Sequence, residues 1–468
     1  MYIIWGKIFY NLKKENVMEE ERTIAAISTP IGVGGISVIR LSGKNALKIA
    51  NKVFNTTLKI EKIEPRKMYL GNFIAQSFKE KCMMVWFKAP NSYTGEDVVE
   101  FQCHGGTVIA NGILETLIEN GAVLAGPGEF TKQAFVNGKL TLDEAEGVMD
   151  MINAESESEV RAGYNLMQGS LSKEINNLQN ELTKMIAKIE VTLDYPENDY
   201  EEQTASETID GLQHIKEKLE HILKTSQTGQ IVKNGSKILI LGKPNVGKSS
   251  LLNAILNFER AIVTSIKGTT RDILEETYTY KGVKFVLTDT AGLHEANDVV
   301  EKIGIEKAKK AVNFADVILL VIDASEPLTQ EDEEILELVK NKKTIVVKNK
   351  TDLKNVVNLN KYNFKHIVEI SALNGQGVED LKNLIYNLVI DENIINSNLM
   401  LTNMRHVEAI KKALKFLDEC LKGLNAGITL DVVSIDLKNL WMALGEITGN
   451  NNNEEIINEI FSGFCVGK

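Results

Sequence analysis

The chain has 468 residues, of which 43% are hydrophobic and 25% are charged. This is an ordinary globular composition, and at about 150 residues per domain the length predicts roughly three domains. The 53 basic and 64 acidic side chains give a net charge of −11, which argues against a protein that wraps nucleic acid by phosphate neutralisation alone. A nucleic-acid partner would therefore require a local basic patch or a second protein.

The cysteines and the apolar runs indicate a cytoplasmic protein. The four cysteines, Cys82, Cys103, Cys420 and Cys465, show no CxxC spacing and are expected to be free thiols in a reducing cytosol. No apolar run approaches the ~20 residues of a membrane span, so no membrane partner is expected. Residues 1–22 are interpreted as an N-terminal extension without a secretory signal, and translation from Met18 is an alternative to Met1.

The segment from Thr23 to Lys139 alternates short apolar runs with glycine-rich turns. Alternation predicts strands at residues 23–28, 35–42, 83–89 and 97–103, and residues 106–121 are predicted to form a helix. These elements indicate a small α+β domain over residues 23–139.

Apolar residues at steps of three and four then predict long amphipathic helices. The first two faces are Leu171, Ile175, Leu178, Leu182, Met185 and Ile189, then Ile209, Leu212, Ile215, Leu219 and Ile222. Two more faces follow after Asp391: Val407, Ile410, Leu414, Leu417 and Leu421, then Leu437, Leu440, Leu444 and Ile447. Either half alone would have little core, so we predict one all-α domain split into residues 140–234 and 392–468.

Between the two helical halves, residues 235–391 alternate apolar strands with helical stretches. The strands are predicted at residues 237–242, 283–289, 315–323, 343–350 and 366–372. Continuous apolar strands between helices are typical of a parallel sheet that is covered on both faces. The whole chain is therefore predicted to be a multidomain α+β and α/β protein with an inserted α/β domain, which the motifs described next indicate to be a Ras-like P-loop domain.

The stretch "GKPNVGKS", Gly242 to Ser249, follows a strand and precedes a helix, as a P-loop must. Backbone N–H groups of such a loop and the helix N-terminus cradle phosphates. Lys248 is expected to reach the β- and γ-phosphates, and the Ser249 hydroxyl is expected to bind Mg²⁺.

Further motifs follow in the order that a guanine-nucleotide site requires. Thr270 would complete the Mg²⁺ shell, Asp289 would hold the ion through water, and the Gly292 N–H would meet the γ-phosphate. In "NKTD" the Asp352 carboxylate can accept both guanine N–H groups, which adenine lacks. The predicted GTP-binding residues are Asn245, Val246, Gly247, Lys248, Ser249, Ser250, Thr270, Asp289, Thr290, Ala291, Gly292, Asn349, Lys350, Asp352, Ser371, Ala372 and Leu373.

The catalytic group is not obvious, because Leu293 follows Asp-Thr-Ala-Gly where many GTPases have a water-orienting glutamine. Glu301 is one candidate to replace it, and the alternative is that Glu301 is an exposed acid on a helix. Asn245 could face a cation near the phosphates, or it could be a turn residue that tolerates positive φ.

These motifs, together with "TIAAISTPIGVGGISVIRLSG", "APNSYTGEDVVEFQCHGG", "PGEFTKQAFVNGKL", "LGEITG" and the terminal "FCVGK", resemble the MnmE/TrmE family of tRNA-modification GTPases. The resemblance runs from about Thr23 to Lys468. Two positions depart from it: Val33 and Gln133 stand where that family often has arginine.

The resemblance implies G-domain dimerisation that is activated by potassium. Asn245, the backbone carbonyls of Thr264 and Ile266, and Thr269 would coordinate K⁺, and Thr264 and Thr269 thereby join the nucleotide site. A cation there can stabilise charge that develops on the phosphates. Glu301 matches the family's water-orienting acid, so the leucine would be compensated.

The resemblance also implies that residues 23–139 bind folate and form a constitutive dimer. Arg40, Glu100, Lys139 and Lys468 match the pocket for 5,10-methylenetetrahydrofolate or 5-formyl-tetrahydrofolate, with basic groups suited to folate carboxylates. Cys465 matches a terminal cysteine with a catalytic role near the folate, although a small apolar packing role is equally open.

The function that the resemblance implies is K⁺-stimulated, Mg²⁺-dependent GTP hydrolysis coupled to tRNA modification. With an FAD-containing partner of the MnmG/GidA type, as a heterotetramer, the homodimer would add a carboxymethylaminomethyl or aminomethyl group to C5 of the wobble uridine. The alternative is a regulatory or ribosome-assembly GTPase that has no role in carbon transfer.

Overall fold

A computed structural model describes residues 22–56, 62–195, 201–257, 275–289, 311–451 and 454–468. The chain forms two compact units, residues 1–149 with 445–468, and residues 150–444. Among the described residues, no helix has the length and apolar character to cross a membrane.

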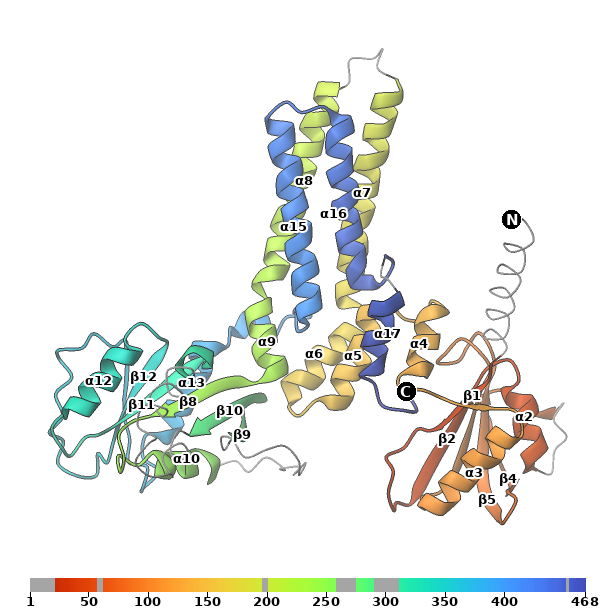
Figure 1. The fold of residues 1–468 in the computed structure, drawn as a ribbon, viewed down its shortest axis with the longest axis horizontal. Helices are drawn as coiled ribbons and strands as arrows, with labels where there is room; N and C mark the ends of the chain where they lie inside the picture. Colours follow the sequence, from red (N-terminus) through yellow and green to blue (C-terminus); the bar gives the residue numbers. More distant parts are fainter. Residues whose placement is uncertain (1–21, 57–61, 196–200, 258–274, 290–310, 452–453) are drawn as a thin grey trace, which may run out of the picture. The chain divides into compact units, whose positions relative to one another are not determined.

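The first unit contains a seven-stranded sheet in the order β3-β4-β5-β6-β2-β1-β7 (Figure 1). Its strands are β1 (Ile24–Ile27), β2 (Ile36–Ser42), β3 (Phe54–Asn55), β4 (Met68–Ile74), β5 (Lys79–Phe87), β6 (Val98–His104) and β7 (Val123–Leu124). Neighbouring strands are antiparallel except β1 and β7, which are parallel. The four strands predicted from alternation are confirmed. Strand β4 was missed because its outward residues, Met68 and Leu70, are also apolar and hide the alternation.

In the part of the chain that the structure describes, the helices of the first unit are α2 (Ala46–Val53), α3 (Thr107–Glu119), α4 (Glu129–Val136), the start of α5 (Leu142–Asn153), the end of α16 (Leu430–Thr448) and α17 (Glu454–Ser462). The α3 helix was predicted, and it packs with α2 on the sheet through a core that includes Ile49, Ile113 and Phe101. A second small core joins Leu142 of α5 to Phe461 near the C-terminus. The last residues of the chain therefore belong to the same compact unit as the first strands.

The helical part of the second unit is built from both sides of the inserted region. Before the insertion lie α6 (Glu157–Met167), α7 (Ser170–Asp194), α8 (Glu201–Lys224) and α9 (Ser226–Asn234), and after it lie α15 (Met404–Asn425) and α16 (Leu430–Thr448). Helices α7, α8, α15 and α16 lie side by side (Figure 1). Lys216 of α8 pairs with Asp418 of α15 at 2.7 Å, and the Gln179 side chain of α7 donates to the Trp441 carbonyl of α16 at 2.9 Å. The prediction of one helical domain that is split in sequence is confirmed.

The inserted region contains a six-stranded sheet in the order β13-β12-β11-β8-β10-β9. Its strands are β8 (Ser236–Leu241), β9 (Glu275–Tyr280), β10 (Val283–Asp289), β11 (Val317–Asp323), β12 (Thr344–Asn349) and β13 (His366–Glu369). Its helices are α10 (Lys248–Asn257), α12 (Gln330–Val339) and α13 (Val378–Val389), and α14 (Glu392–Ile395) follows them. All predicted strands are present and parallel, whereas the polar edge strand β9 was missed and runs antiparallel to β10.

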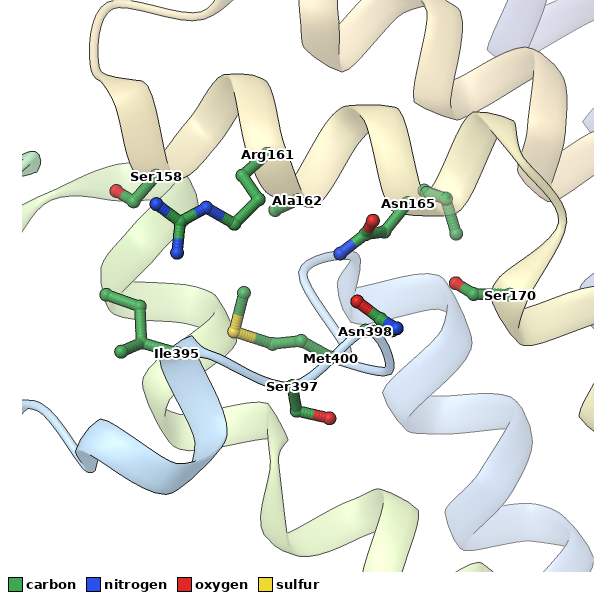
Figure 2. A pocket seen from close by; sticks show the side chains of 10 residues that line it. Ser158, Arg161, Ala162, Asn165, Ser170, Ile395, Ser397, Asn398 and Met400 are labelled. Carbon is green, nitrogen blue, oxygen red and sulfur yellow. The ribbon is translucent and has the colours of Figure 1, made fainter.

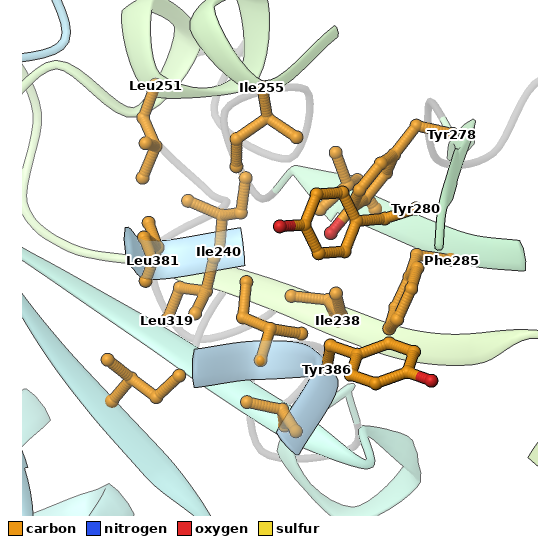
Figure 3. Close-up of a cluster of buried hydrophobic side chains, with 14 of the residues drawn as sticks. Ile238, Ile240, Leu251, Ile255, Tyr278, Tyr280, Phe285, Leu319, Leu381 and Tyr386 are labelled. Carbon is orange, nitrogen blue, oxygen red and sulfur yellow. The ribbon is translucent and has the colours of Figure 1, made fainter. Parts of the chain in front are cut away.

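Buried clusters on both faces of this sheet explain its apolar strands. On one face Ile238, Ile240 and Leu319 pack against Leu251 of α10 and Leu381 of α13 (Figure 3). The other face packs Leu239 and Leu320 against Leu336 of α12. The predicted parallel sheet with two covered faces is therefore confirmed.

The two ends of the inserted region meet at α9. The Thr225 hydroxyl accepts from Leu401 N at 3.0 Å, and the Gln230 amide of α9 donates to the Thr402 carbonyl at 2.9 Å. Beside this junction, Figure 2 shows a small cavity between α6 and the segment after α14, lined among others by Arg161 and Ser397. The α9 backbone approaches the returning chain so closely that a Cβ at Gly229 would lie 2.1 Å from the Leu401 carbonyl oxygen.

We predict that Gly229→Ala destabilises the protein by about 1–3 kcal/mol, because the backbone of Leu401 cannot move aside cheaply. Gly211→Ala in α8 is the matched control. A Cβ there would meet only the end of the Met185 side chain, its methyl carbon at 2.1 Å and its sulfur at 3.3 Å. Since that methyl group can swing away, the helix propensity of alanine should leave stability unchanged or raise it by up to ~1 kcal/mol.

Thermal and denaturant unfolding of the full chain would measure both changes. Equal stability of the two variants would show that the α9 backbone does not pack against residue 401 as described.

Candidate functional site

Five parallel strands of the inserted sheet end at one edge, and the predicted nucleotide motifs follow four of them. Asp289 at the end of β10 is in register with Ile240 of β8, and Asp323 at the end of β11 is in register with Asn349 of β12. The loop from Gly242 to Gly247 continues from β8 at this edge. Ligands of open α/β sheets bind beyond the carboxyl ends of the strands. The fold thus brings the predicted P-loop and "NKTD" motif together.

The P-loop is anchored in the core and holds its lysine inward. Val246 is fully buried, and Lys248, the first residue of α10, is 7% exposed. The Lys248 ammonium donates to the carbonyls of Gly242 at 2.8 Å and Lys243 at 2.9 Å. These bonds hold the ammonium over the start of the loop, where a phosphate chain that is cradled by the loop would lie. Ser249 and Ser250 are exposed in the first turn of α10.

Asn349 links three of the predicted motifs. Its side-chain amide donates to the Val246 carbonyl at 2.9 Å, and its side-chain oxygen accepts from Ala372 N at 3.0 Å. Asn349 is 2% exposed, so an unpaired amide here would be costly. Because the amide passes so close, a Cβ at Gly247 (φ +96°) would lie 2.3 Å from Asn349 Nδ2, and only glycine fits.

The residue after Asn349 has an unusual backbone conformation. Lys350 has φ +64°, a left-handed conformation that costs an L-residue about 1–2 kcal/mol. Its ammonium lies 2.5 Å from Oδ2 of Asp323, whose side chain is 5% exposed. Burial alone would raise the pKa of Asp323, but hydrogen bonds from Lys350 and Ser325 outweigh burial and leave that pKa below its ordinary value. Asp352 and Leu373 are exposed.

Sequence reasoning missed two buried carboxylates that hold loops of this site. Asp323 could have been noticed, because it ends an otherwise apolar strand. Asp332 could not: its Oδ2 accepts from the Lys243 ammonium of the P-loop at 3.0 Å, across 89 residues of chain. Asp332 also forms the capping box of α12 with Thr329. A lysine in a loop and an acid in a first helical turn both indicate solvated positions when each is considered alone.

Several predicted site residues lie outside the described part of the chain. These are Thr264, Ile266, Thr269, Thr270, Thr290, Ala291, Gly292, Leu293 and Glu301. Their roles remain predictions. Asn245 is described: it is exposed with φ +64°, the geometry of the turn interpretation, and its potassium role also remains a prediction. Ser371 is buried, and its hydroxyl accepts from Asn374 N at 3.3 Å.

A second group of predicted residues lies in the first unit. Arg40 of β2 and Glu100 of β6 are in register, and their side chains pair at 2.8 Å. The Arg40 guanidinium lies over the rings of Tyr93 and Phe130, 5.7 and 5.6 Å from their centroids. Such stacking suits a guanidinium in a partly dry site.

Lys468 belongs to this Arg40–Glu100 cluster. Its carbonyl accepts from Phe130 N at 3.2 Å. Burial and the charge of Arg40 lower the pKa of Lys468, while Glu100 and Cys465 act in the opposite direction. Three of the four predicted folate residues are therefore within electrostatic reach of one another.

The fourth folate residue, Lys139, has a different partner. Its ammonium donates to the Pro90 carbonyl at 3.0 Å, in the loop that also carries Tyr93. The side chain of Cys465 is exposed, and its carbonyl accepts from Gly128 N at 3.3 Å. Burial raises the pKa of the Cys82 and Cys420 thiols to about 12.

Comparison with known proteins supports the combination of an N-terminal domain, helical segments and an inserted P-loop domain in one chain. The family model for the MnmE helical domain matches residues 142–465, and the model for the GTP-binding protein TrmE N-terminus matches residues 23–139. The tRNA modification GTPase MnmE of Clostridioides difficile is 43% identical over 95% of this chain and 99% of its own length. That of Lactobacillus delbrueckii is 43% identical over 96% of this chain and 99% of its own length.

Three similar solved structures each cover a third of the chain. The G domain of the T. maritima FeoB iron transporter is 26% identical, covers 33% of this chain and 99% of its own, and has a TM-score of 0.25. The family models and the full-length relatives carry the assignment instead. With the P-loop, Asn349 and the two helical halves placed as described, the chain belongs to the MnmE family of tRNA modification GTPases.

Proposed function

We propose that this GTPase acts with a folate one-carbon donor and an FAD-containing partner of the MnmG/GidA type. The homodimer would hydrolyse GTP with potassium stimulation and help to add a carboxymethylaminomethyl or aminomethyl group to C5 of the wobble uridine. The observation that carries the proposal is the position of Lys468 beside Arg40 and Glu100. This cluster lies in the unit that does not contain the P-loop, so nucleotide binding does not account for it.

The residues of the cluster fit a folate. Arg40 and Lys468 provide two cationic groups, and Glu100 provides an acceptor that suits the N–H edge of a pterin. The lowered pKa of Lys468 means that its charged form is poorly compensated where it lies. A ligand carboxylate placed there would offset that cost and raise the pKa of Lys468. When bound, the folate would supply the one-carbon unit.

The described part of the nucleotide site fits the proposed metal ions. The Ser249 hydroxyl at the start of α10 is a hard oxygen donor of the kind that Mg²⁺ takes, and Thr270 is its proposed companion. Asn245 exposes a carboxamide within the P-loop, which suits K⁺ together with Thr264, Ile266 and Thr269. Glu301 is proposed to orient the attacking water in place of Leu293. Asp352 would accept both guanine N–H groups.

The charge distribution supports a tRNA substrate despite the net charge of −11. Residues 22–139 contain 14 Lys and Arg against 9 Asp and Glu, which is a net charge of +5 for that segment. The rest of the chain therefore carries −16. RNA phosphates would meet less repulsion at the N-terminal segment, and the partner protein would supply further contacts.

We predict that Lys468→Ala weakens binding of 5-formyl-tetrahydrofolate by roughly tenfold, because one charged hydrogen-bond donor is lost. Titration calorimetry on the full chain would measure the change. Lys132→Ala is the control, since that half-buried lysine donates to Asn458 Oδ1 at 2.7 Å and its loss should leave folate binding unchanged. If the unaltered protein binds no folate, the regulatory-GTPase alternative is favoured. If both variants bind equally well, Lys468 does not contact the ligand.

We predict that hydrolysis of saturating GTP is several-fold faster in KCl than in NaCl at matched ionic strength. Glu301→Ala should lower kcat by about 10²-fold or more in KCl, as expected for loss of a general base or water-orienting group. Phosphate-release assays would measure both effects. Equal turnover in the two salts would contradict the potassium role, and unchanged kcat in the variant would contradict the role of Glu301.

We predict that tRNA from cells that lack this gene loses the C5-substituted wobble uridine. Mass spectrometry of digested nucleosides would detect the loss, and a plasmid with the intact gene should restore the nucleoside. An unaltered nucleoside profile would exclude the modification while leaving the GTPase assignment intact.

A further inference from the structure

The short loop after β11 supports the "NKTD" turn from two sides. Asp323 uses both carboxylate oxygens: Oδ1 accepts from the Ser325 backbone N–H at 2.9 Å and from its hydroxyl at 2.6 Å, and Oδ2 pairs with the Lys350 ammonium at 2.5 Å. Between them, Ala324 N donates to the Asn349 carbonyl at 2.9 Å. The loop thus holds the backbone of Asn349 and the side chain of Lys350 at the same time.

The conformation of Lys350 makes this support important. Its φ of +64° is a region that lysine adopts rarely, and such a residue keeps it only where its surroundings impose it. The turn at Lys350 separates Asn349, which is 2% exposed, from Asp352, which is exposed to solvent three residues after Asn349. A relaxed backbone at Lys350 would change the direction in which Asp352 leaves the turn, while the Asn349 contacts fix the other end.

We propose that Asp323 is a positioning residue for guanine recognition, acting through Lys350 to hold the left-handed turn that aims Asp352 at the base. Asp323 is 4% exposed and lies beneath the turn, so it would not touch the nucleotide. Its lowered pKa agrees with a carboxylate that is ionised and paired at neutral pH. The proposal rests on the GTP chemistry of the family and assigns a role that none of the nucleotide motifs contains.

The first experiment compares Asp323→Asn with Asp316→Asn in the full chain. Asparagine keeps the acceptor for Ser325 and removes the charge that holds Lys350. We expect the Kd for GDP to rise roughly tenfold, as for loss of a hydrogen bond between charged groups. Inosine lacks the exocyclic amine from which the Asp352 carboxylate would accept a hydrogen bond. The Kd for inosine diphosphate (IDP) should therefore rise less than the Kd for GDP, and the preference for GDP over IDP should fall. The kcat at saturating GTP should stay within about twofold, because bound nucleotide still meets the same P-loop.

Asp316 is the matched control at the opposite end of β11. It is exposed, and its carboxylate accepts from the Lys237 backbone N–H at 2.7 Å. Asp316→Asn should leave the preference for GDP over IDP unchanged. If Asp323→Asn also leaves it unchanged, the proposal is wrong. An equal fall in both variants would show a general effect of altering this strand and would also overturn it.

The second experiment tests whether Asp323 acts through Lys350. Glycine adopts positive φ without strain, so in a Lys350→Gly background the further change Asp323→Asn should alter the Kd for GDP by less than about twofold. A tenfold loss in that background would overturn the proposal.

Thermal unfolding would show whether Asp323→Asn folds. If it does not fold, Lys350→Met, which still requires the strained turn, should lose more preference for GDP than Lys350→Gly. Equal losses would refute the positioning role.

Discussion

The side chain of Asn349 is the interaction on which the nucleotide site depends. One carboxamide group joins the P-loop at Val246 to the loop after β13 at Ala372, and Asn349 is itself the last residue of strand β12. An amide can bridge a donor and an acceptor without a net charge, so it can be buried almost completely at little cost once both ends are bonded. Loops that are separate in sequence therefore acquire fixed positions relative to one another.

The parallel sheet is what allows such a bridge. The carboxyl ends of parallel strands meet at one edge, and the strands here are held by apolar layers on both faces, so the loops begin from rigid positions. The attachment of this region to the helices is equally constrained. Its two ends meet at α9, where the Gly229 backbone contacts Leu401. The helical halves can then pack as one bundle, although 169 residues lie between the end of α9 and the start of α15.

Much of the architecture could be predicted because periodicity and motif order are local properties of the sequence. The longer apolar strands of both sheets, the helical faces and the split domain followed from the patterns, whereas the two-residue strands β3 and β7 were not predicted. Strands β4 and β9 were missed because apolar residues lie on the exposed side of one and polar residues dominate the other. Contacts across long stretches of chain, such as Lys243 with Asp332, leave no pattern in either segment. The proximity of Lys468 to Arg40 was implied only by resemblance.

Unlike the neutral amide of Asn349, the ionised groups around the nucleotide site need a partner of opposite charge when they are buried. A buried charge is tolerated only with a partner, and Asp323 and Lys350 satisfy each other, as do Asp332 and Lys243. In both pairs the lysine belongs to one of the loops at this edge of the sheet, and the acid is either the last residue of β11 (Asp323) or in the first turn of α12 (Asp332). These two loop lysines are thus occupied by protein carboxylates, whereas the Lys248 ammonium donates to the P-loop carbonyls of Gly242 and Lys243. The two carboxylate–lysine pairs therefore fix the loops that carry them.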